Sequence, residues 1–245
     1  MELTDKVALV TGGSRGIGAA TAKKLATHGA RVAVTYQENR SSAEATVEAI
    51  RRSGGTATAL QTSAENRASV DTMMDRVVSA FGRIDILVNN AGIFTAKPLS
   101  EVGFDLYTRQ FNANVWGMIQ ITQAALPHFP ASGGRIINIA SARMYAPRDG
   151  TGLYAASKAA VSVLTHALAI ELGPRSITVN AVAPAVTETD MTAKMPPEKK
   201  ASFAKATPLG RIGLPEDIAD VIAFLASDEA RWVNGRTIRA DGGLS

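Results

Sequence analysis

Tyr154 and Lys158 are four residues apart in the segment Tyr-Ala-Ala-Ser-Lys-Ala-Ala, which contains few helix breakers. At this spacing both side chains project from one face of a helix. An ammonium beside a phenol favours the phenolate and lowers a pKa of about 10 toward the range in which tyrosine exchanges a proton with a carbonyl or alcohol oxygen. A Tyr and a Lys at this spacing are also common surface neighbours, so the pair needs support from the rest of the sequence.

A glycine-rich segment runs from Gly12 to Gly18, between an apolar run at residues 6–11 and a helical pattern that begins at Ile17. Its glycines would permit a tight turn and a close backbone approach, and the helix N-terminus would present free N–H groups to a pyrophosphate. A flexible glycine turn is the alternative, but the flanking strand and helix favour a dinucleotide site. The residues expected to bind the cofactor here are Gly12, Ser14, Arg15, Gly16, Ile17 and Gly18.

Tyr36 follows the second apolar run, where a fold selective for NAD usually places an acidic residue on the ribose 2′-hydroxyl. Arg15 and Arg40 would instead offer positive charge to an added 2′-phosphate. We therefore expect NADP(H) to be preferred over NAD(H). Two alternatives remain, because Glu38 could still reach the ribose and Arg15 could be a solvated residue at the start of the helix.

Short apolar runs alternate with helical patterns along the whole chain. The runs lie at residues 6–11, 31–35, 56–61, 85–89, 135–139, 176–181 and 237–240, and the helical patterns at 17–28, 42–52, 68–81, 102–129, 151–172 and 215–226. Strands that are apolar on both faces and joined by helices are typical of a covered parallel sheet. We therefore predict an α/β fold, a Rossmann-like doubly wound parallel sheet with helices on both faces, as a single domain over residues 1–245.

The segment 187–212 interrupts this alternation, because it carries Pro196, Pro197 and Pro208 among polar residues. We expect either a mobile lid or an inserted helical pair over a site. This segment would bind substrate, and loops at 94–100 and 143–153 would also contribute to specificity.

The composition excludes several kinds of site. There is no cysteine, so no disulfide, thiolate nucleophile or zinc–sulfur site is possible, and His28, His128 and His166 are too scattered to hold a metal. The net charge of +4 comes from dispersed residues, which argues against nucleic acid as a partner. No apolar stretch approaches the ~20 residues that span a bilayer, and the N-terminus does not read as a signal peptide. We expect a soluble cytoplasmic protein with no membrane partner.

Over its whole length the sequence resembles the classical short-chain dehydrogenase/reductase family. The motifs that carry the resemblance occur in the family's order: Thr11 to Gly18, Asn89-Asn90-Ala91-Gly92, Asn114, Ser141, Tyr154 with Lys158, and Asp241-Gly242-Gly243. The resemblance implies that Tyr154 is the general acid in carbonyl reduction and the general base in alcohol oxidation. Lys158 would lower the pKa of Tyr154 and hold the nicotinamide ribose. Ser141 would hydrogen-bond the substrate oxygen, and its place after a strand supports that role independently.

The resemblance implies roles for further residues. Asn114 would shape a helix bend and a water relay toward Lys158, although it could be a capping or turn asparagine, and Asn112 is a local rival. The other implied cofactor contacts are Asn90, Ala91, Gly92, Tyr154 and Lys158, with Pro184 and Thr187 at the nicotinamide carboxamide.

Two positions depart from the family pattern. Near Ser63 the family commonly has an aspartate that meets adenine, so this chain would contact adenine only through hydroxyl or backbone groups. Ala185 stands where the family usually has glycine, which is tolerable only if the local φ is negative.

These features predict an NADP(H)-dependent oxidoreductase that transfers a hydride between nicotinamide and a small carbonyl compound or secondary alcohol, in the manner of a carbonyl reductase. The chief alternative is a 3-oxoacyl-(acyl-carrier-protein) reductase, because residues 187–191 and 208–217 resemble that branch too. A basic patch near Arg143, Arg148 and Lys194 could then receive an acidic carrier protein. A non-catalytic dinucleotide-binding sensor is the alternative from another class. The resemblance further implies a homotetramer.

Overall fold

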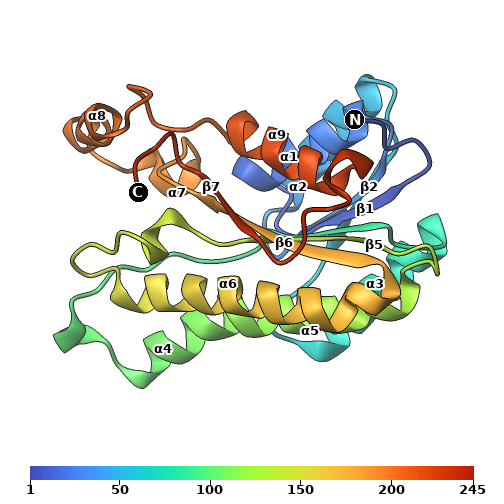
Figure 1. The fold of residues 1–245 in the computed structure, drawn as a ribbon, viewed down its shortest axis with the longest axis horizontal. Coiled ribbons are helices and arrows are strands. Elements are labelled where there is room, and N and C mark those ends of the chain that lie inside the picture. Colours follow the sequence, from blue (N-terminus) through green and yellow to red (C-terminus); the bar gives the residue numbers. More distant parts are fainter.

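The computed structural model describes residues 1–245 and contains one seven-stranded sheet of order β3-β2-β1-β4-β5-β6-β7. All neighbouring strands pair in parallel, and helices cover both faces (Figure 1). The strands are β1 Val7–Val10, β2 Arg31–Tyr36, β3 Ala57–Gln61, β4 Ile86–Asn89, β5 Gly134–Ile139, β6 Ile177–Pro184 and β7 Thr237–Ala240. The predicted doubly wound parallel sheet is confirmed.

The sheet separates two apolar layers. On one face, side chains of β1 such as Val10 pack with Leu25 and Ile222 from the helices above; on the other face, Leu9 packs with Met73 and Ile121. Successive side chains of a strand point to opposite faces of the sheet, so each buried strand contributes apolar side chains to both layers. The helices are α1 Gly16–Thr27, α2 Arg40–Arg52, α3 Arg67–Phe81, α4 Phe104–Phe111, α5 Gly117–Ala125, α6 Gly152–Leu172, α7 Asp190–Ala193, α8 Pro197–Ala206 and α9 Pro215–Ala226.

Side-chain capping sets the start of two helices. The Asn39 side chain accepts a hydrogen bond from the Ser42 amide, so α2 begins at Arg40, two residues earlier than the apolar pattern indicates. Asn66 caps α3 in the same way through the Ser69 amide. Each cap satisfies an amide that the first helical turn leaves unpaired.

The helix predicted over residues 102–129 corresponds to α4 and α5, which a π-helical turn at Asn112–Trp116 joins. Asn114, where a helix bend was expected, lies in this turn. Within this turn the Asn114 side chain bonds the backbone of Ile93 in the loop after β4 and the hydroxyl of Ser157 on α6. The π turn contains one more residue than an α-helical turn, and this extra residue places the Asn114 side chain opposite Ile93 and Ser157. Because these partners are distant in sequence, helical periodicity does not reveal the turn.

Strand β6 extends three residues beyond the predicted end at residue 181. It does so because its last residues pair with β7, as far as Pro184 opposite Ala240. The segment 187–212 contains the two short helices α7 and α8.

A chain of buried polar side chains fixes α5 and α6 against the sheet. The Asn89 amide donates to Thr122 of α5 at 3.0 Å and to Asn138 of β5 at 2.9 Å. Asn138 in turn donates to Thr165 of α6 at 2.9 Å. Because these groups lie out of reach of water, losing one partner would leave another unpaired, so the chain holds α6 in one position.

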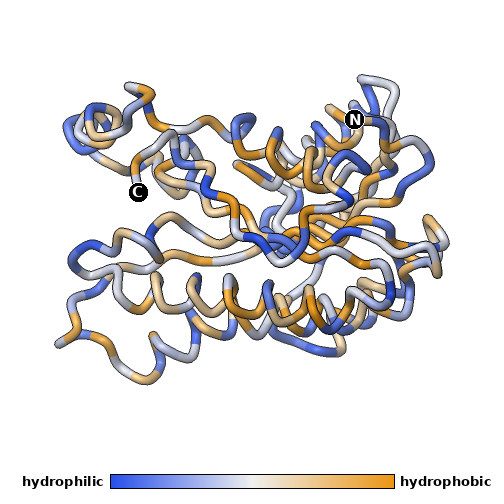
Figure 2. The backbone as a smooth tube through the Cα atoms, in the orientation of Figure 1, coloured by the Kyte–Doolittle hydropathy of each residue, from blue (hydrophilic) through white to orange (hydrophobic).

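One helix, Gly152–Arg175, is long and apolar enough to cross a membrane by length and composition alone. In this fold it packs against β6 and the other elements of the lower face, and core helices of this kind pass the same test. Figure 2 shows that apolar residues also run along the central strands.

Candidate active site

A cavity of about 900 Å³ lies at the carboxyl ends of the parallel strands. Its lining includes Gly12 after β1, Asn90 after β4, Ser141 after β5 and Ala185 after β6. The strand order changes direction between β1 and β4, and open α/β sheets bind ligands at such a point. The topology therefore gathers the predicted motifs in one place.

The glycine-rich turn forms a cradle that larger residues would fill. Gly12 and Gly16 have φ values of +62° and +54°, which favour glycine. A Cβ on Gly18 would lie 2.3 Å from the Gly12 carbonyl oxygen and 2.5 Å from Asn90 Nδ2. No side chain caps the first turn of α1, so its amides face the cavity unpaired. This close backbone and positive helix end fit a pyrophosphate.

Asn90 ties the cradle to the loop after β4. Its Nδ2 donates to the carbonyls of Thr11 at 2.9 Å and Gly12 at 3.1 Å. The Thr11 hydroxyl accepts hydrogen bonds from the amides of Asn90 and Ala91, both at 2.9 Å. Asn90, Ala91 and Gly92 all line the cavity, as do Ser14, Arg15, Gly16, Ile17 and Gly18.

At the expected adenosine end, Tyr36 and Arg15 line the cavity, whereas Arg40 and Ser63 do not. Arg40 is the first residue of α2 and lies 3.7 Å from Glu44, so the Asn39 cap draws it onto the helix and away from the cavity. The Ser63 amide donates to Ser69 at the start of α3. The cofactor contacts of Arg40 and Ser63 stay predictions. Their neighbours Glu38, Asn39, Thr62 and Glu65 line the cavity instead.

Lys158 is 5% exposed, and its Nζ donates to the Ile139 carbonyl at 2.7 Å. Burial lowers the pKa of Lys158 to about 8, because an ammonium is poorly stabilised away from water. Its side chain therefore connects α6 to the end of β5, directly below the cavity.

The Tyr154 and Ser141 side chains lie together in the cavity, and their hydroxyls are close enough to interact. Burial raises the pKa of Tyr154, while the Ser141 hydroxyl and the positive charge of Arg143 oppose this rise. The Lys158 ammonium bonds a carbonyl in the protein alone, so the lowering of the Tyr154 pKa by Lys158 stays a prediction.

Asn114 is 2% exposed and lies behind the cavity wall. Its side chain accepts from the Ile93 amide at 2.8 Å and donates to the Ile93 carbonyl at 3.0 Å. A Cβ on Gly92 would lie 2.9 Å from Asn114 Oδ1 and 3.4 Å from Lys158 Nζ, so these groups meet at Gly92. Asn114, rather than Asn112, occupies the buried position in the helix bend.

Pro184 and Thr187 line the cavity on the β6 side. Ala185 has no positive φ, since Asp5 and Ser176 are the non-glycine residues with positive φ in this chain. The backbone condition for its extra methyl group is therefore met.

Comparisons with known proteins agree with this geometry. The family model described as enoyl-(acyl carrier protein) reductase matches residues 12–245. An uncharacterized oxidoreductase of Methylorubrum extorquens is 45% identical over 99% of this chain and 99% of its own. A 3-oxoacyl-[acyl-carrier-protein] reductase of Staphylococcus aureus is 41% identical over 100% of this chain and 99% of its own. The chain belongs to the short-chain dehydrogenase/reductase family.

A solved structure of this short-chain dehydrogenase/reductase family is also similar. The crystal structure of a short chain dehydrogenase from Burkholderia cenocepacia in complex with NADP has a TM-score of 0.94 and 42% sequence identity. The match covers 100% of this chain and 99% of that chain. The family expected from the ordered motifs is confirmed, and with it an oxidoreductase function.

Sequence reasoning missed how other residues of this short-chain dehydrogenase/reductase surround Tyr154. The Phe94 ring meets the Tyr154 ring edge-on, with centroids 4.8 Å apart and an interplanar angle of 83°. Arg143, expected in a basic patch and at the start of the specificity loop 143–153, lines the cavity beside Ser141. Its position two residues after Ser141 was the available signal.

Lys158→Met should change the pH dependence of stability. The folded protein releases this proton near pH 8, whereas the unfolded chain holds it to about pH 10.4, so the unfolded state binds more protons between these values. The free energy of unfolding should therefore rise with pH in this window. From pH 8 to 10 we expect the rise to be smaller in Lys158→Met than in the wild type by roughly 1–3 kcal/mol.

Urea titrations at several pH values would measure this difference, with the exposed Lys205→Met as the matched control. Equal pH dependence in Lys158→Met and the wild type would contradict the lowered pKa.

Proposed function

We propose that this chain is an NADP(H)-dependent oxidoreductase that transfers a hydride between nicotinamide and a small carbonyl compound or secondary alcohol. The observation that carries the proposal is that Ser141 and Tyr154, whose hydroxyls interact, line the same cavity as the glycine cradle and Lys158. A proton donor and a second hydroxyl thus converge where one substrate oxygen would bind.

The side chains have separable tasks in carbonyl reduction. The bound nicotinamide supplies the hydride. Ser141 and Tyr154 would both donate hydrogen bonds to the carbonyl oxygen, and Tyr154 would transfer its proton as negative charge develops there. Burial raises the pKa of Tyr154, which keeps the phenol protonated at neutral pH, as the acid role requires. The buried Lys158 ammonium would stabilise the phenolate left behind and hold the cofactor ribose.

The preference for NADP(H) is supported by Arg15 at the cradle and Tyr36 at the end of β2. Arg15 Nη1 lies 3.2 Å from Asp190 Oδ2 on α7, and both side chains are exposed. A 2′-phosphate would therefore compete with one solvated carboxylate for the guanidinium, and phosphate can accept two parallel hydrogen bonds. Glu38, which also lines the cavity, favours NAD(H) in this comparison.

A second candidate, 3-oxoacyl-(acyl-carrier-protein) reductase, is favoured by the 41% identity to the Staphylococcus aureus enzyme of that name. It uses the same Ser141 and Tyr154 chemistry and differs in what carries the carbonyl group. A non-catalytic sensor would need only the cradle.

Tyr154→Phe should lower the rate of NADPH oxidation with ketones, keto esters or 3-oxoacyl thioesters by about 10²- to 10⁴-fold, because it removes only the proton donor. NADPH absorbance would measure the rate, and calorimetry would measure NADPH binding, which should persist. The exposed Tyr107→Phe on α4 is the matched control and should keep the wild-type rate. If the wild type binds NADPH but turns over no faster than Tyr154→Phe with any of these compounds, the sensor alternative is correct.

Arg15→Ala should weaken NADPH binding by about 10- to 100-fold and leave NADH binding almost unchanged, because only NADPH has the 2′-phosphate. Gly18→Ala should weaken both, since its Cβ would lie 2.3 Å from the Gly12 carbonyl oxygen. Calorimetric dissociation constants would separate the two effects. Equal losses for both cofactors in Arg15→Ala would contradict a 2′-phosphate contact.

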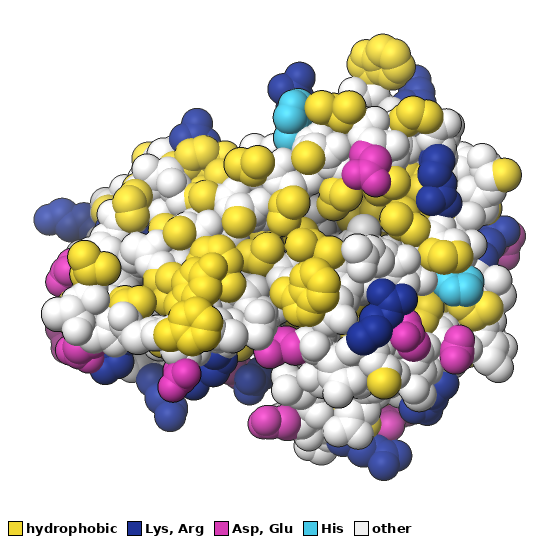
Figure 3. All heavy atoms as spheres, turned by 90° about the horizontal axis from the view of Figure 1, so that it is seen from below, with side chains coloured by type: hydrophobic (Ala, Val, Ile, Leu, Met, Phe, Trp, Pro, Cys, Tyr) yellow, Lys and Arg dark blue, Asp and Glu magenta, His cyan; other side chains and the backbone are white.

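The proposal includes a cytoplasmic location, expected from the composition, and a homotetramer, expected from the resemblance. The face formed by α4, α5 and α6 exposes large apolar side chains, including Phe104, Trp116, Val163 and Ile170 (Figure 3). Contiguous exposed apolar surface of this kind supports association between copies. Sedimentation velocity should find a species with the mass of four chains, and a single chain at micromolar concentration would contradict the assembly.

A further inference from the structure

We propose that Arg143 and Arg148 form an anion subsite at the substrate end of the cavity, and that the substrate is a carbonyl compound bearing a carboxylate. This inference rests on the proposed function and specifies its substrate class. Both arginines line the same cavity as Ser141 and Tyr154. They come from the loop between β5 and α6, directly after Ser141 in the chain.

The two guanidinium groups are held at this place by Phe203 of α8. The Phe203 ring is 2% exposed, and its centroid lies 5.3 Å from Arg143 Cζ and 4.3 Å from Arg148 Cζ. A cation over an aromatic face is attracted by the ring quadrupole, and the planar guanidinium can stack there. The ring thus gathers two positive groups from one loop against α8.

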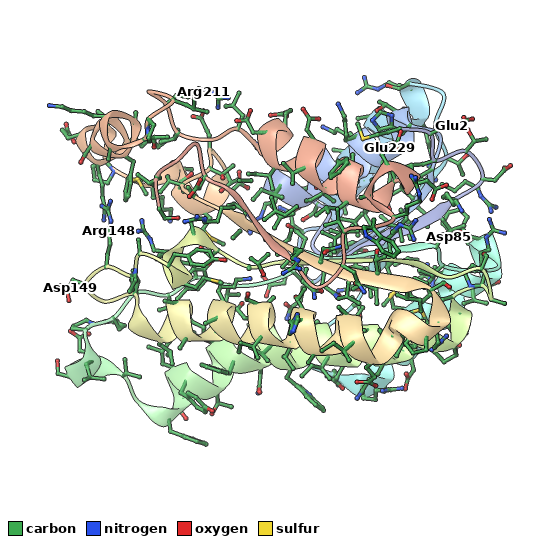
Figure 4. All side chains as sticks on the ribbon, viewed as in Figure 1. Glu2, Asp85, Arg148, Asp149, Arg211 and Glu229 are labelled. Atoms are coloured by element: carbon green, nitrogen blue, oxygen red, sulfur yellow. The ribbon has the colours of Figure 1, made fainter.

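No carboxylate of this chain compensates these two charges. Neither arginine forms an ion pair within 4.0 Å, whereas Arg15 is paired with Asp190. Asp149 follows Arg148 in the chain, but Figure 4 shows it at the tip of the loop while Arg148 extends toward α8. The acidic residues that line the cavity near β2 and β3, Glu38 and Glu65, belong to the cofactor end.

The hydrogen-bonding capacity of both groups is also largely free. Arg143 Nη1 donates to the Ala146 carbonyl at 3.3 Å. A guanidinium has five N–H donors in a planar fork that matches a carboxylate. Burial and then repulsion by Arg148 lower the pKa of Arg143, so an anion between the two groups would relieve an existing electrostatic cost.

The subsite is electrostatically coupled to the reacting end. The positive charge of Arg143 opposes the rise in the pKa of Tyr154, so the two groups lie within interaction range. A carboxylate that neutralised Arg143 would weaken this opposition and raise the pKa of Tyr154 further. The charge state of the subsite would therefore be felt at the reacting phenol.

This location favours a carboxylate on the substrate over an acidic carrier protein. Lys194, the third residue of the predicted basic patch, does not line the cavity with Arg143 and Arg148. A carrier protein would dock outside and would need several exposed cations around the entrance, whereas of the two arginines that line the cavity Arg148 is exposed and Arg143 is half-buried beside Ser141.

The test compares 4-oxopentanoate with its methyl ester in NADPH-dependent reduction. The two compounds share the ketone and differ in charge. The wild type should have the higher kcat/KM for the acid, and Arg143→Met/Arg148→Met should lower the acid-to-ester ratio of kcat/KM at least tenfold, or about 1.4 kcal/mol. Methionine keeps apolar contact with Phe203 but has no charge. If the two arginines had a purely structural role, the double variant would lower kcat/KM for the acid and the ester equally and leave their ratio unchanged. Arg143→Lys keeps the positive charge, so its acid-to-ester ratio should lie closer to that of the wild type than the ratio of the double methionine variant.

The exposed Arg76→Met on α3 is the matched control and should keep the wild-type ratio. A second readout is calorimetric binding of pentanoate, which has the carboxylate but no ketone, to the protein with NADP. Pentanoate binding that is present in the wild type and lost in the double methionine variant supports the subsite without any turnover. If no carbonyl compound were reduced, the proposed function would be overturned, but this binding result would still support the subsite.

Three results would overturn the subsite. The first is an acid-to-ester ratio that is the same in the wild type and the double methionine variant. The second is absence of pentanoate binding to the wild type. The third is a dependence on Arg143 and Arg148 that is found only when a 3-oxoacyl group is attached to carrier protein and not to a small thioester, which would assign the two arginines to a carrier protein.

Discussion

The hydrogen bond from the Lys158 ammonium to the Ile139 carbonyl, 2.7 Å long, joins α6 to the carboxyl end of β5. An ammonium buried without such a partner would cost several kcal/mol, so the bond is a condition for placing this charge inside the fold. The buried chain from Asn89 through Asn138 to Thr165 holds α6 in the position that the bond requires. Tyr154, one helical turn before Lys158, is thereby fixed beside Ser141, which itself follows β5. The acid–base site thus depends on one helix being held against one strand end.

The segment 187–212 contacts both ends of the cavity. Through Asp190 it reaches Arg15 at the cradle, and through Phe203 it reaches Arg143 and Arg148 at the substrate end. The positive charge is balanced at one end only. Arg15 at the cradle has a carboxylate partner, whereas Arg143 and Arg148 at the substrate end have an aromatic ring. One segment therefore adjoins the expected positions of both cofactor and substrate, which is consistent with its departure from the regular alternation of strands and helices.

Much of the fold follows from local signals. Apolar runs of strand length, separated by helical patterns, predict a parallel sheet because no other arrangement buries both faces of every strand. Helical periodicity over residues 102–129 does not reveal the π turn around Asn114, which forms to reach Ile93 and Ser157, residues distant in sequence. Arg40 was expected beside the cofactor, but the Asn39 cap lengthens α2 and places Arg40 on it, outside the cavity lining. Ser63 was expected at the cofactor because of its place after β3, and the structure puts its neighbours there instead.

The sequence by itself determined the order of the elements, the glycine cradle and the shared helical face of Tyr154 and Lys158, because turn conformation and helical spacing depend on neighbouring residues. Only the tertiary structure decided the electrostatics of the pair. Burial raises the pKa of Tyr154 and lowers that of Lys158, and the cation that acts on Tyr154 is Arg143. It also decided that Arg143 and Arg148 meet over Phe203 with no carboxylate partner. Desolvation and Coulomb interactions depend on distances in space, and groups that are far apart in the chain set those distances.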